Sequence, residues 1–141
     1  MKLGVLKEPE GETRVAIVPT SLKKLQKAGF EVVIEAGAGT AANYHDAEYE
    51  AAGATVGTRD DALACETIIT IRFPGVEGMK EGTNLACVSD PFRNPQYVKD
   101  CLASNITLLS MDMIPRRLSR AQSMDVNSSQ DNLAGYKAVL L

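Results

Sequence analysis

The chain has 141 residues, 45% of them hydrophobic and 23% charged, which is enough for one domain with a buried core and excludes bulk disorder. Fifteen Lys and Arg against 18 Asp and Glu give a formal net charge of −3. The basic residues are dispersed, so the composition excludes a nucleic-acid-binding protein that relies on a basic surface. No apolar run approaches the ~20 residues that a membrane-spanning helix needs, and Lys7 comes too early for the apolar part of a signal peptide. We therefore expect no direct membrane insertion.

The three cysteines, Cys65, Cys87 and Cys101, are odd in number and have no C-x-x-C spacing. This pattern argues against a disulfide scaffold and against a zinc site, and it is typical of a protein in a reducing cytoplasm. We expect the cysteines to be small buried hydrophobic residues, and we expect no metal site.

Short apolar runs alternate with amphipathic segments along the first 110 residues. We expect strands at 2–6, 31–36, 54–56, 67–71, 85–88 and 106–109, and helices at 19–28, 46–52, 60–64 and 94–103. The continuous β-branched run at 67–71 is typical of a strand that is buried on both faces. The sequence therefore predicts an α/β fold, a single flavodoxin-like or Rossmann-like lobe in which a parallel sheet carries helices on both faces.

The last thirty residues follow a different pattern. Residues 111–123 are loop-like, and 125–141 have apolar residues at helical spacing, namely Leu133, Tyr136, Val139 and Leu140. No capping residue follows Leu141, so the helix is cut off within its apolar pattern. We expect a lobe over residues 1–123 and a connecting helix over 124–141, and the interrupted pattern indicates a piece of a longer protein.

The segment 37–42, Gly-Ala-Gly-Thr-Ala-Ala, fits the dinucleotide pattern G-x-G-x-x-A directly after a predicted strand. The next residues, 43–46, interrupt the helix whose N-terminus would hold a pyrophosphate. We therefore interpret this segment as a plain turn, with nucleotide binding as the alternative.

Most other polar residues have ordinary structural interpretations. His45, the only histidine, is expected to be solvated or paired with an Asp, and it supplies neither a catalytic triad nor a metal site by itself. The acidic pairs Asp60-Asp61 and Glu48 with Glu50 are expected to be solvated. Arg14 and Arg72 are either surface ion-pair partners or ligands for a carboxylate or phosphate, since 67–71 ends at the sheet edge where ligands bind.

The densest polar cluster spans residues 117–125 and continues through 128–130. Arginine, glutamine, aspartate and serine lie here within a dozen positions at a loop-to-helix junction. Such a loop offers hydrogen-bond donors and acceptors to an amide or a ribose, without a group that titrates near neutral pH. The alternative is an N-capped helix with a polar start.

Residues 120–125 and 135–139 resemble the alpha subunit of proton-translocating NAD(P) transhydrogenase. Earlier segments agree with that family in order and spacing: Lys7-Glu8 with Arg14-Val15-Ala16, the run 35–39, and Tyr49 with 51–54. The resemblance covers essentially the whole chain, but only about the N-terminal third of the family's NAD(H)-binding component. It also places the chain in the wider alanine dehydrogenase/transhydrogenase N-terminal domain family.

The resemblance implies direct hydride transfer from NADH, bound by this component, to NADP+ on a separate NADP(H)-binding component. A membrane-spanning component couples the transfer to proton translocation. The implied assembly contains a homodimer of this component and lies in the cytoplasm, peripheral to the inner membrane through its partners. Because the lobe lacks the family's NAD fingerprint, we expect it to be inactive alone.

The resemblance also assigns roles to residues of the polar cluster. Arg117 would contact NADH, and Gln122 would reach toward the partner's nucleotide, while Asp125 and Ser128 would orient the nicotinamide carboxamide. Gln122 and Asp125 would be the catalytic pair. An additional residue in this stretch leaves Arg116 as the alternative to Arg117. Asn127 stands where the family usually has an apolar residue.

Alanine dehydrogenase resembles this lobe as well, but its reaction needs a proton donor, and it uses a histidine and a lysine. Here Arg72 falls at the lysine position, and residues 85–90 contain no histidine. Hydride transfer between two nicotinamides needs no proton donor, so the missing pair favours transhydrogenase. The alternatives are an alanine dehydrogenase-like amino-acid oxidoreductase lobe and a non-catalytic fragment or dimerisation module.

Overall fold

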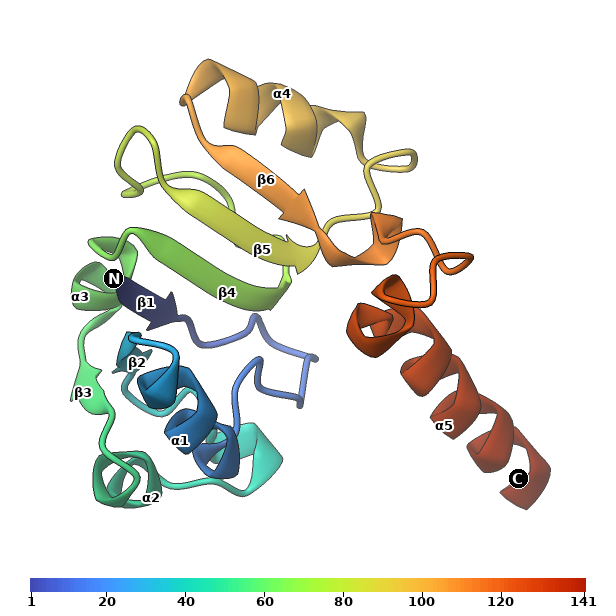
Figure 1. The fold of residues 1–141 in the computed structure, drawn as a ribbon, viewed down its shortest axis with the longest axis horizontal. Coiled ribbons are helices and arrows are strands. Elements are labelled where there is room, and N and C mark those ends of the chain that lie inside the picture. Colours follow the sequence, from blue (N-terminus) through green and yellow to red (C-terminus); the bar gives the residue numbers. More distant parts are fainter.

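A computed structural model describes residues 1–141 and shows one parallel sheet flanked by helices (Figure 1). The strands are β1 (Lys2–Val5), β2 (Glu31–Glu35), β3 (Thr55–Gly57), β4 (Thr67–Arg72), β5 (Asn84–Val88) and β6 (Thr107–Ser110). The helices are α1 (Pro19–Lys27), α2 (Asp46–Ala51), α3 (Arg59–Leu63), α4 (Pro95–Ala103) and α5 (Val126–Leu140). Short 3₁₀ helices are η1 (Thr40–Ala42), η2 (Met111–Met113) and η3 (Ala121–Met124).

The strands have the order β3-β2-β1-β4-β5-β6, and every neighbouring pair is parallel. This is the Rossmann order, in which the direction of winding reverses between the first and fourth strands. The predicted α/β class with helices on both faces is confirmed, and the order selects the Rossmann-like topology over the flavodoxin-like one.

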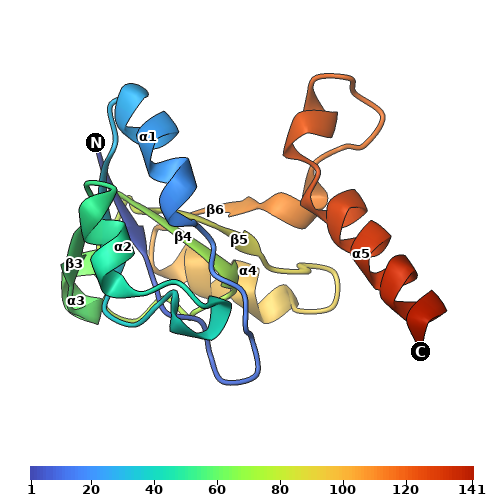
Figure 2. The same cartoon turned by 90° about the horizontal axis from the view of Figure 1, so that it is seen from below.

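Each face of the sheet has its own hydrophobic core. On one face, Leu22 of α1 and Tyr49 of α2 pack against β1 and β2. On the other, Leu63 of α3 and Cys101 of α4 pack against β4 and β5. Figure 2 shows α1 and α4 on opposite sides of the strands. The helices therefore cover β1–β3 on the first face. On the second face α3 lies over β1 and β2 and α4 lies over β6, and their side chains pack in the core over β4 and β5.

The connection between β4 and β5 contains no helix. Its apolar residues, Phe73, Val76 and Met79, pack against the core on the α3/α4 face. No helix of this connection therefore covers β4 and β5 on the α1/α2 face. That half of the face carries Ile69, Ile71, Ala86 and Val88, and it forms the floor of a groove.

Gly4 lets α3 lie directly against the central strand. A Cβ atom at this position would lie 2.1 Å from the backbone oxygen of Ala62 in α3, which is far inside contact distance. Ala62 is completely buried and packs in the same core as Leu6 of the segment that follows β1. The packing of α3, the helix that connects β3 to β4, against β1 therefore depends on the absence of a side chain at Gly4.

The prediction of buried cysteines is confirmed, since Cys65, Cys87 and Cys101 are all free thiols in the interior. Burial raises the pKa of Cys87 to about 12, so this thiol stays protonated and packs as a small apolar group. None of the helices is both long and apolar enough to cross a membrane.

Candidate functional site

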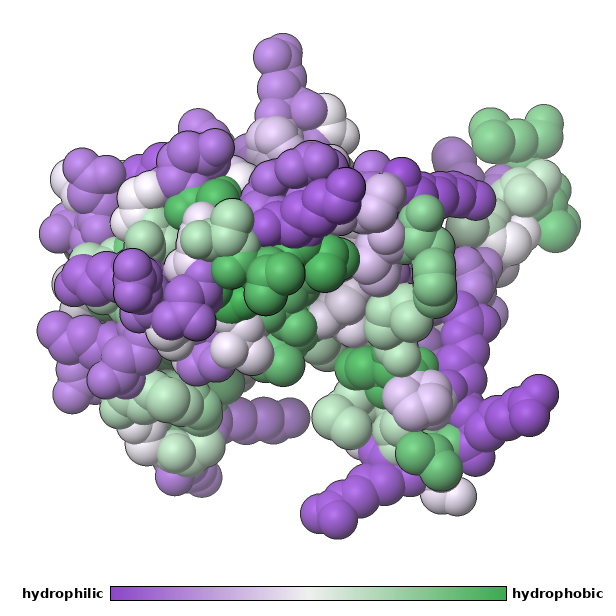
Figure 3. Space-filling model, turned by 90° about the horizontal axis from the view of Figure 1, so that it is seen from above, coloured by the Kyte–Doolittle hydropathy of each residue, from purple (hydrophilic) through white to green (hydrophobic).

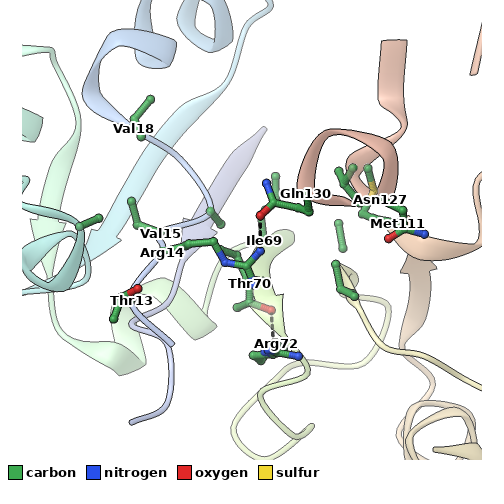
Figure 4. A pocket seen from close by; sticks show the side chains of 16 residues that line it. Thr13, Arg14, Val15, Val18, Ile69, Thr70, Arg72, Met111, Asn127 and Gln130 are labelled. Atoms are coloured by element: carbon green, nitrogen blue, oxygen red, sulfur yellow. Dashed lines mark hydrogen bonds between the residues drawn. The ribbon is translucent and has the colours of Figure 1, made fainter. Parts of the chain in front are cut away.

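A groove of about 740 Å³ opens at the carboxyl edge of the sheet, between residues 13–18 and the first turns of α5 (Figure 4). Strands β4 and β5 form its apolar floor, and Arg14, Asn127 and Gln130 lie at its polar rim. In a doubly wound sheet, ligands bind beyond the carboxyl ends of the strands, where the winding reverses. The groove therefore lies in the region where this fold binds its ligands.

Two arginines converge on one carboxylate beside this groove. The Nε and Nη2 atoms of Arg14 donate to the two oxygens of Glu12, both at 2.7 Å, and the Nε atom of Arg72 donates to Glu12 Oε2 at 3.0 Å. The Arg14 guanidinium is the main cause that lowers the pKa of Glu12 to about 2. Of the two alternatives left open for Arg14 and Arg72, the structure therefore shows the ion pair.

Arg14 also links the two sides of the groove. Its Nη1 atom donates to Oε1 of Gln130 at 2.8 Å, across a sequence separation of 116 residues (Figure 4). A second contact holds α5 from the other side, because Nδ2 of Asn127 donates to the backbone oxygen of Asp112 at 3.2 Å. The start of α5 is thus tied to the sheet edge by two polar side chains.

Glu8 fixes the end of β4. Its carboxylate accepts hydrogen bonds from the backbone N–H groups of Ile71 at 2.6 Å and Arg72 at 2.9 Å. Desolvation by burial raises the pKa of this carboxyl group, although the two backbone donors oppose the shift. Strand β4 shifts register against β5 between Ile69 and Arg72, so Glu8 holds the irregular end from which Arg72 reaches Glu12.

A second carboxylate, Asp112 in η2, joins the ends of β5 and β6. It accepts hydrogen bonds from the backbone N–H groups of Ser89 and Asp90, both at 3.1 Å, and from the hydroxyl of Ser110 at 2.7 Å. The hydroxyls of Ser89 and Ser110 lie 2.6 Å apart. Sequence reasoning missed this cluster, because its members come from three segments with no shared motif.

The polar cluster at residues 117–128 forms an exposed loop that leads into α5. Asp125 is the N-cap of α5, and its carboxylate accepts the backbone N–H of Ser128 at 3.0 Å and also the Ser128 hydroxyl. These hydrogen bonds, the hydroxyl first, lower the pKa of Asp125. Asp125 and Ser128 are therefore already paired, as an N-capped helix requires.

The two other predicted residues of this loop are not in contact with that pair. Gln122 is exposed in η3, and its side-chain amide makes no hydrogen bond within the chain. Arg117 is also exposed. Its neighbour Arg116 is the arginine that approaches Asp125, with 3.7 Å between Nε and Oδ2. Arg116, which the sequence left as the alternative to Arg117, is therefore the arginine that lies at the N-terminus of α5.

None of the four predicted residues lines the groove. Asn127 and Gln130 lie on the face of α5 that meets the groove, whereas Ser128 lies on the opposite side of the helix, at 100° per residue. The loop presents the Ser128 hydroxyl and the free amide of Gln122 to solvent, whereas the side chain of Asp125 is only 10% exposed. A ligand that contacts both the groove and this loop would have to pass over the first turn of α5.

The glycine-rich segment after β2 is a turn, as expected. The backbone N–H of Gly37 donates to both carboxylate oxygens of Asp46, at 2.9 and 3.1 Å, and α2 begins only at Asp46. A Cβ at Gly39 would lie 2.7 Å from the Tyr49 ring, so this glycine serves packing. The carboxylate of Asp46 therefore accepts the Gly37 backbone N–H that a bound phosphate would otherwise use.

His45 is exposed at the start of α2 and is not paired with Asp46, whose carboxylate faces Gly37. The acidic residues expected to be merely solvated include two that cap helices. Glu48 accepts the backbone N–H of His45 at 2.9 Å, and Asp61 accepts that of Thr58 at 2.8 Å. No group of three or more His, Cys, Asp or Glu side chains is arranged to hold a metal ion.

Replacing Glu12 by glutamine should lower the free energy of unfolding by about 1–2 kcal/mol at neutral pH, because two guanidinium groups lose their charged acceptor. The folded-state pKa of Glu12 is depressed from 4.5 to about 2, so its contribution is complete above pH 4.5 and is lost as the pH falls toward 2. Urea unfolding at several pH values measures the difference between wild type and Glu12→Gln.

The expected result is a difference that shrinks steadily between pH 5 and pH 2. Glu10→Gln is the matched control, because Glu10 is exposed and no hydrogen bond or ion pair involves its side chain. A difference for Glu12→Gln that stays constant over this range would contradict the ion-pair assignment.

Comparison with known proteins gives a consistent result. Residues 4–134 match the family described as "Alanine dehydrogenase/PNT, N-terminal domain". The chain is 41% identical to the NAD(P) transhydrogenase subunit alpha of Cereibacter sphaeroides, over 99% of this chain and 28% of that protein. Its structure matches the crystal structure of transhydrogenase from Sinorhizobium meliloti with a TM-score of 0.94 and 42% identity, covering 99% of this chain and 43% of that one.

A solved L-alanine dehydrogenase is more distant, with a TM-score of 0.78 and 26% identity over 86% of this chain and 34% of that one. The chain therefore spans less than half the length of each of these relatives.

Proposed function

The chain belongs to the alanine dehydrogenase/PNT N-terminal domain family, and from this premise we propose that it supplies the N-terminal lobe for direct hydride transfer between NADH and NADP+. In this proposal the transfer is that of a proton-translocating NAD(P)+ transhydrogenase. The lobe acts within a complete alpha subunit, and residues 1–141 alone are inactive.

One observation carries this choice within the family: no histidine–lysine pair of the kind that alanine dehydrogenase uses lines the two pockets at the carboxyl edge of the sheet. Neither the groove nor the adjacent polar pocket, which contains Ser89, Asp90 and Tyr97, has a histidine or a lysine among its lining residues. Arg72, at the strand end, is bound to Glu12. Hydride transfer between nicotinamides needs orientation and proximity, which such a site supplies without acid–base groups.

The exposed loop offers groups that fit a nicotinamide carboxamide. A carboxamide has two N–H donors, and the Asp125 carboxylate and the lone pairs of the Ser128 hydroxyl, whose own proton is donated to Asp125, can accept from them. The free amide of Gln122 lies in the same loop and is available to a second nucleotide. When bound, NADH supplies the hydride, and the residues of this chain orient its ring. Arg117, or Arg116 in its place, contacts the bound NADH through its positively charged guanidinium group.

The proposal extends to the assembly. Residues 1–123 form the lobe, and 124–141 form the helix that leads toward an NAD-binding Rossmann domain such as the longer relatives have room for. The subunit is a homodimer that pairs with an NADP(H)-binding component and a membrane-spanning component. It lies in the cytoplasm, peripheral to the inner membrane through those partners.

A chimera tests the function. Residues 1–141 would replace the matching part of the transhydrogenase alpha subunit of C. sphaeroides, and the product would be assayed with an NADP(H)-binding component. We expect NADH-dependent reduction of NADP+, no NADH-dependent amination of pyruvate, and neither activity in residues 1–141 alone. Amination of pyruvate without transhydrogenation would favour the alanine dehydrogenase-like alternative, which the solved L-alanine dehydrogenase supports at the level of the fold.

A further inference from the structure

The residues proposed to meet the nicotinamide lie at the start of α5. Asp125 is the N-cap of this helix, and Ser128 lies in its first turn. In the space-filling view, a hollow separates the body of the lobe from the part that carries the preceding loop (Figure 3). The placement of Asp125 and Ser128 relative to the sheet therefore depends on the contacts that tie the start of α5 to the lobe.

Gln130 makes one of these contacts, on the side of the helix away from the proposed nicotinamide contacts. Its Oε1 atom accepts a hydrogen bond from Nη1 of Arg14 at 2.8 Å across the groove (Figure 4). Gln130 follows Ser128 by two residues, which is about 200° around a helix, so the two side chains lie on opposite sides of α5. A change at Gln130 therefore acts on Ser128 through the helix.

Arg14 is itself fixed, because Glu12 binds it at two points. The Nε and Nη2 atoms of Arg14 donate to the two Glu12 oxygens, both at 2.7 Å, which leaves Nη1 for Gln130. The Glu12 side chain is only 8% exposed, and it also accepts from Arg72 of β4 at 3.0 Å. A guanidinium held by two such hydrogen bonds keeps one orientation. A continuous series of hydrogen bonds therefore runs from the end of β4 to α5.

A second contact limits the rotation of α5 about the first. The Nδ2 atom of Asn127 donates to the backbone oxygen of Asp112 at 3.2 Å. The Asp112 carboxylate is in turn bound by the backbone N–H groups of Ser89 and Asp90, just after β5. Asn127 and Gln130 are three residues apart and share one side of the helix. Two contacts on one side, toward the ends of different strands, fix both the position and the tilt of the first turn.

We propose that Arg14 and Gln130 are positioning residues of the hydride-transfer site. Their hydrogen bond holds the first turn of α5 in the orientation in which Asp125 and Ser128 meet the nicotinamide carboxamide. Hydride transfer is sensitive to such placement, because an error of about 1 Å can slow a reaction about 100-fold. The inference rests on the proposed function and deepens it by naming two residues that act on the site through α5.

Two substitutions of Gln130 in the chimera test this role. Leucine has a similar size but no acceptor, whereas glutamate keeps an oxygen for Arg14. We expect Gln130→Leu to slow single-turnover hydride transfer about tenfold, and Gln130→Glu to keep the rate within about twofold. The Kd for NADH should change less than about threefold in both, because most contacts with NADH would lie in the Rossmann domain.

Asn132→Leu is the matched control for Gln130→Leu. Asn132 is an exposed amide on the same helix, two residues beyond Gln130, and it does not line the groove. The substitution also replaces an amide by leucine, so it reproduces any general effect of an added apolar side chain on α5. It should leave both the transfer rate and the Kd unchanged.

A double-mutant cycle tests whether Arg14 acts through Gln130. Arg14→Lys replaces the planar fork by one ammonium group, which cannot bind Glu12 at two points and also reach Gln130. It should slow transfer by about as much as Gln130→Leu, and the combined variant should be no slower than either. Losses that multiply to about 100-fold would show that the two residues act independently, and would contradict the link.

The contact can also be measured without hydride transfer. The three native cysteines are buried, so nitroxide labels can be placed selectively on Lys23→Cys in α1 and Lys137→Cys in α5, both at exposed positions of residues 1–141. Double electron–electron resonance then gives the distribution of distances between the lobe and the helix. We expect a narrow distribution for wild type and Gln130→Glu, and a broader one for Gln130→Leu.

The other outcomes separate this inference from the proposed function. A chimera that transfers no hydride with its native Gln130 would contradict the proposed function and the positioning role with it. An active chimera in which Gln130→Leu keeps the native rate would overturn the positioning role alone. Loss of NADH affinity in parallel with the rate would show that Gln130 serves binding instead. An unchanged distance distribution in Gln130→Leu would show that other contacts hold α5, which also overturns the inference.

Discussion

Replacing Gly4 by alanine is expected to lower the free energy of unfolding by about 3 kcal/mol or more. The new methyl group would lie 2.1 Å from the backbone oxygen of Ala62, and a backbone atom of a buried helix cannot turn aside as a side-chain tip can. Relief requires α3 to move off the central strand, which opens the core that contains Leu63, Ile68 and Leu85. Urea unfolding followed by circular dichroism measures the loss.

Gly135→Ala is the control for this prediction. A Cβ at Gly135 meets nothing within 4 Å, and the residue lies inside the exposed helix α5. Alanine there should be neutral or should stabilise the chain by up to about 1 kcal/mol, through helix propensity alone. Equal stability of Gly4→Ala and wild type would contradict the close packing of α3 on β1.

Replacing Gln122 by asparagine in the chimera is expected to slow hydride transfer about 100-fold, because a reach shortened by one methylene misplaces the amide between the two nucleotides. NADH binding should change by less than about threefold, since Asp125 and Ser128 remain paired at the start of α5. Stopped-flow absorbance gives the transfer rate, and fluorescence titration with NADH gives the Kd.

Gln96→Asn is the matched control, because Gln96 is exposed on α4 and bonds only within that helix, to Asp100. It should leave both the rate and the Kd unchanged. Loss of NADH affinity in parallel with the rate for Gln122→Asn would show instead that Gln122 serves binding, and an unchanged rate would remove it from the transfer site.

Local patterns were sufficient to predict most of the elements. The helix over 19–28 is α1, ending at Lys27, and Gly29 follows its C-cap with a positive φ, as glycines after helices often do. The run 67–71 is β4, but it is not buried on both faces, because Ile69 and Ile71 are only partly buried where they form the groove floor. These features depend on residues within a few positions of one another, which is the range over which propensity, capping and periodicity act.

The contacts that shape the site depend instead on long-range geometry. The sequence showed that Arg14 and Arg72 are charged and lie near apolar runs, but not that both donate to Glu12. Glu8 reaches backbone N–H groups 63 and 64 residues away, and no local pattern predicts this. The order of the strands in the sheet decides which strand ends lie side by side. That order depends on how the helices pack on both faces of the sheet.

The loop residues show the same limit. The pairing of Asp125 with Ser128 follows from N-cap spacing and was within reach of the sequence. The groove floor over β4 and β5 could not be predicted in the same way. The sequence does not reveal that the β4–β5 connection lacks a helix and packs on the α3/α4 face. The roles of Arg117, Gln122, Asp125 and Ser128 toward NADH remain predictions from family resemblance, for which the structure supplies compatible groups.

The central claim is that hydride passes between two nicotinamides without a proton donor in this lobe, and isotopic substitution tests it most directly. Single-turnover transfer by the chimera would be measured with NADH deuterated at the transferred position, and separately with ordinary NADH in D₂O. We predict a slower rate with the deuterated nucleotide and an unchanged rate in D₂O. A rate that slows in D₂O would contradict the claim, because it would mean that a proton moves in the same step.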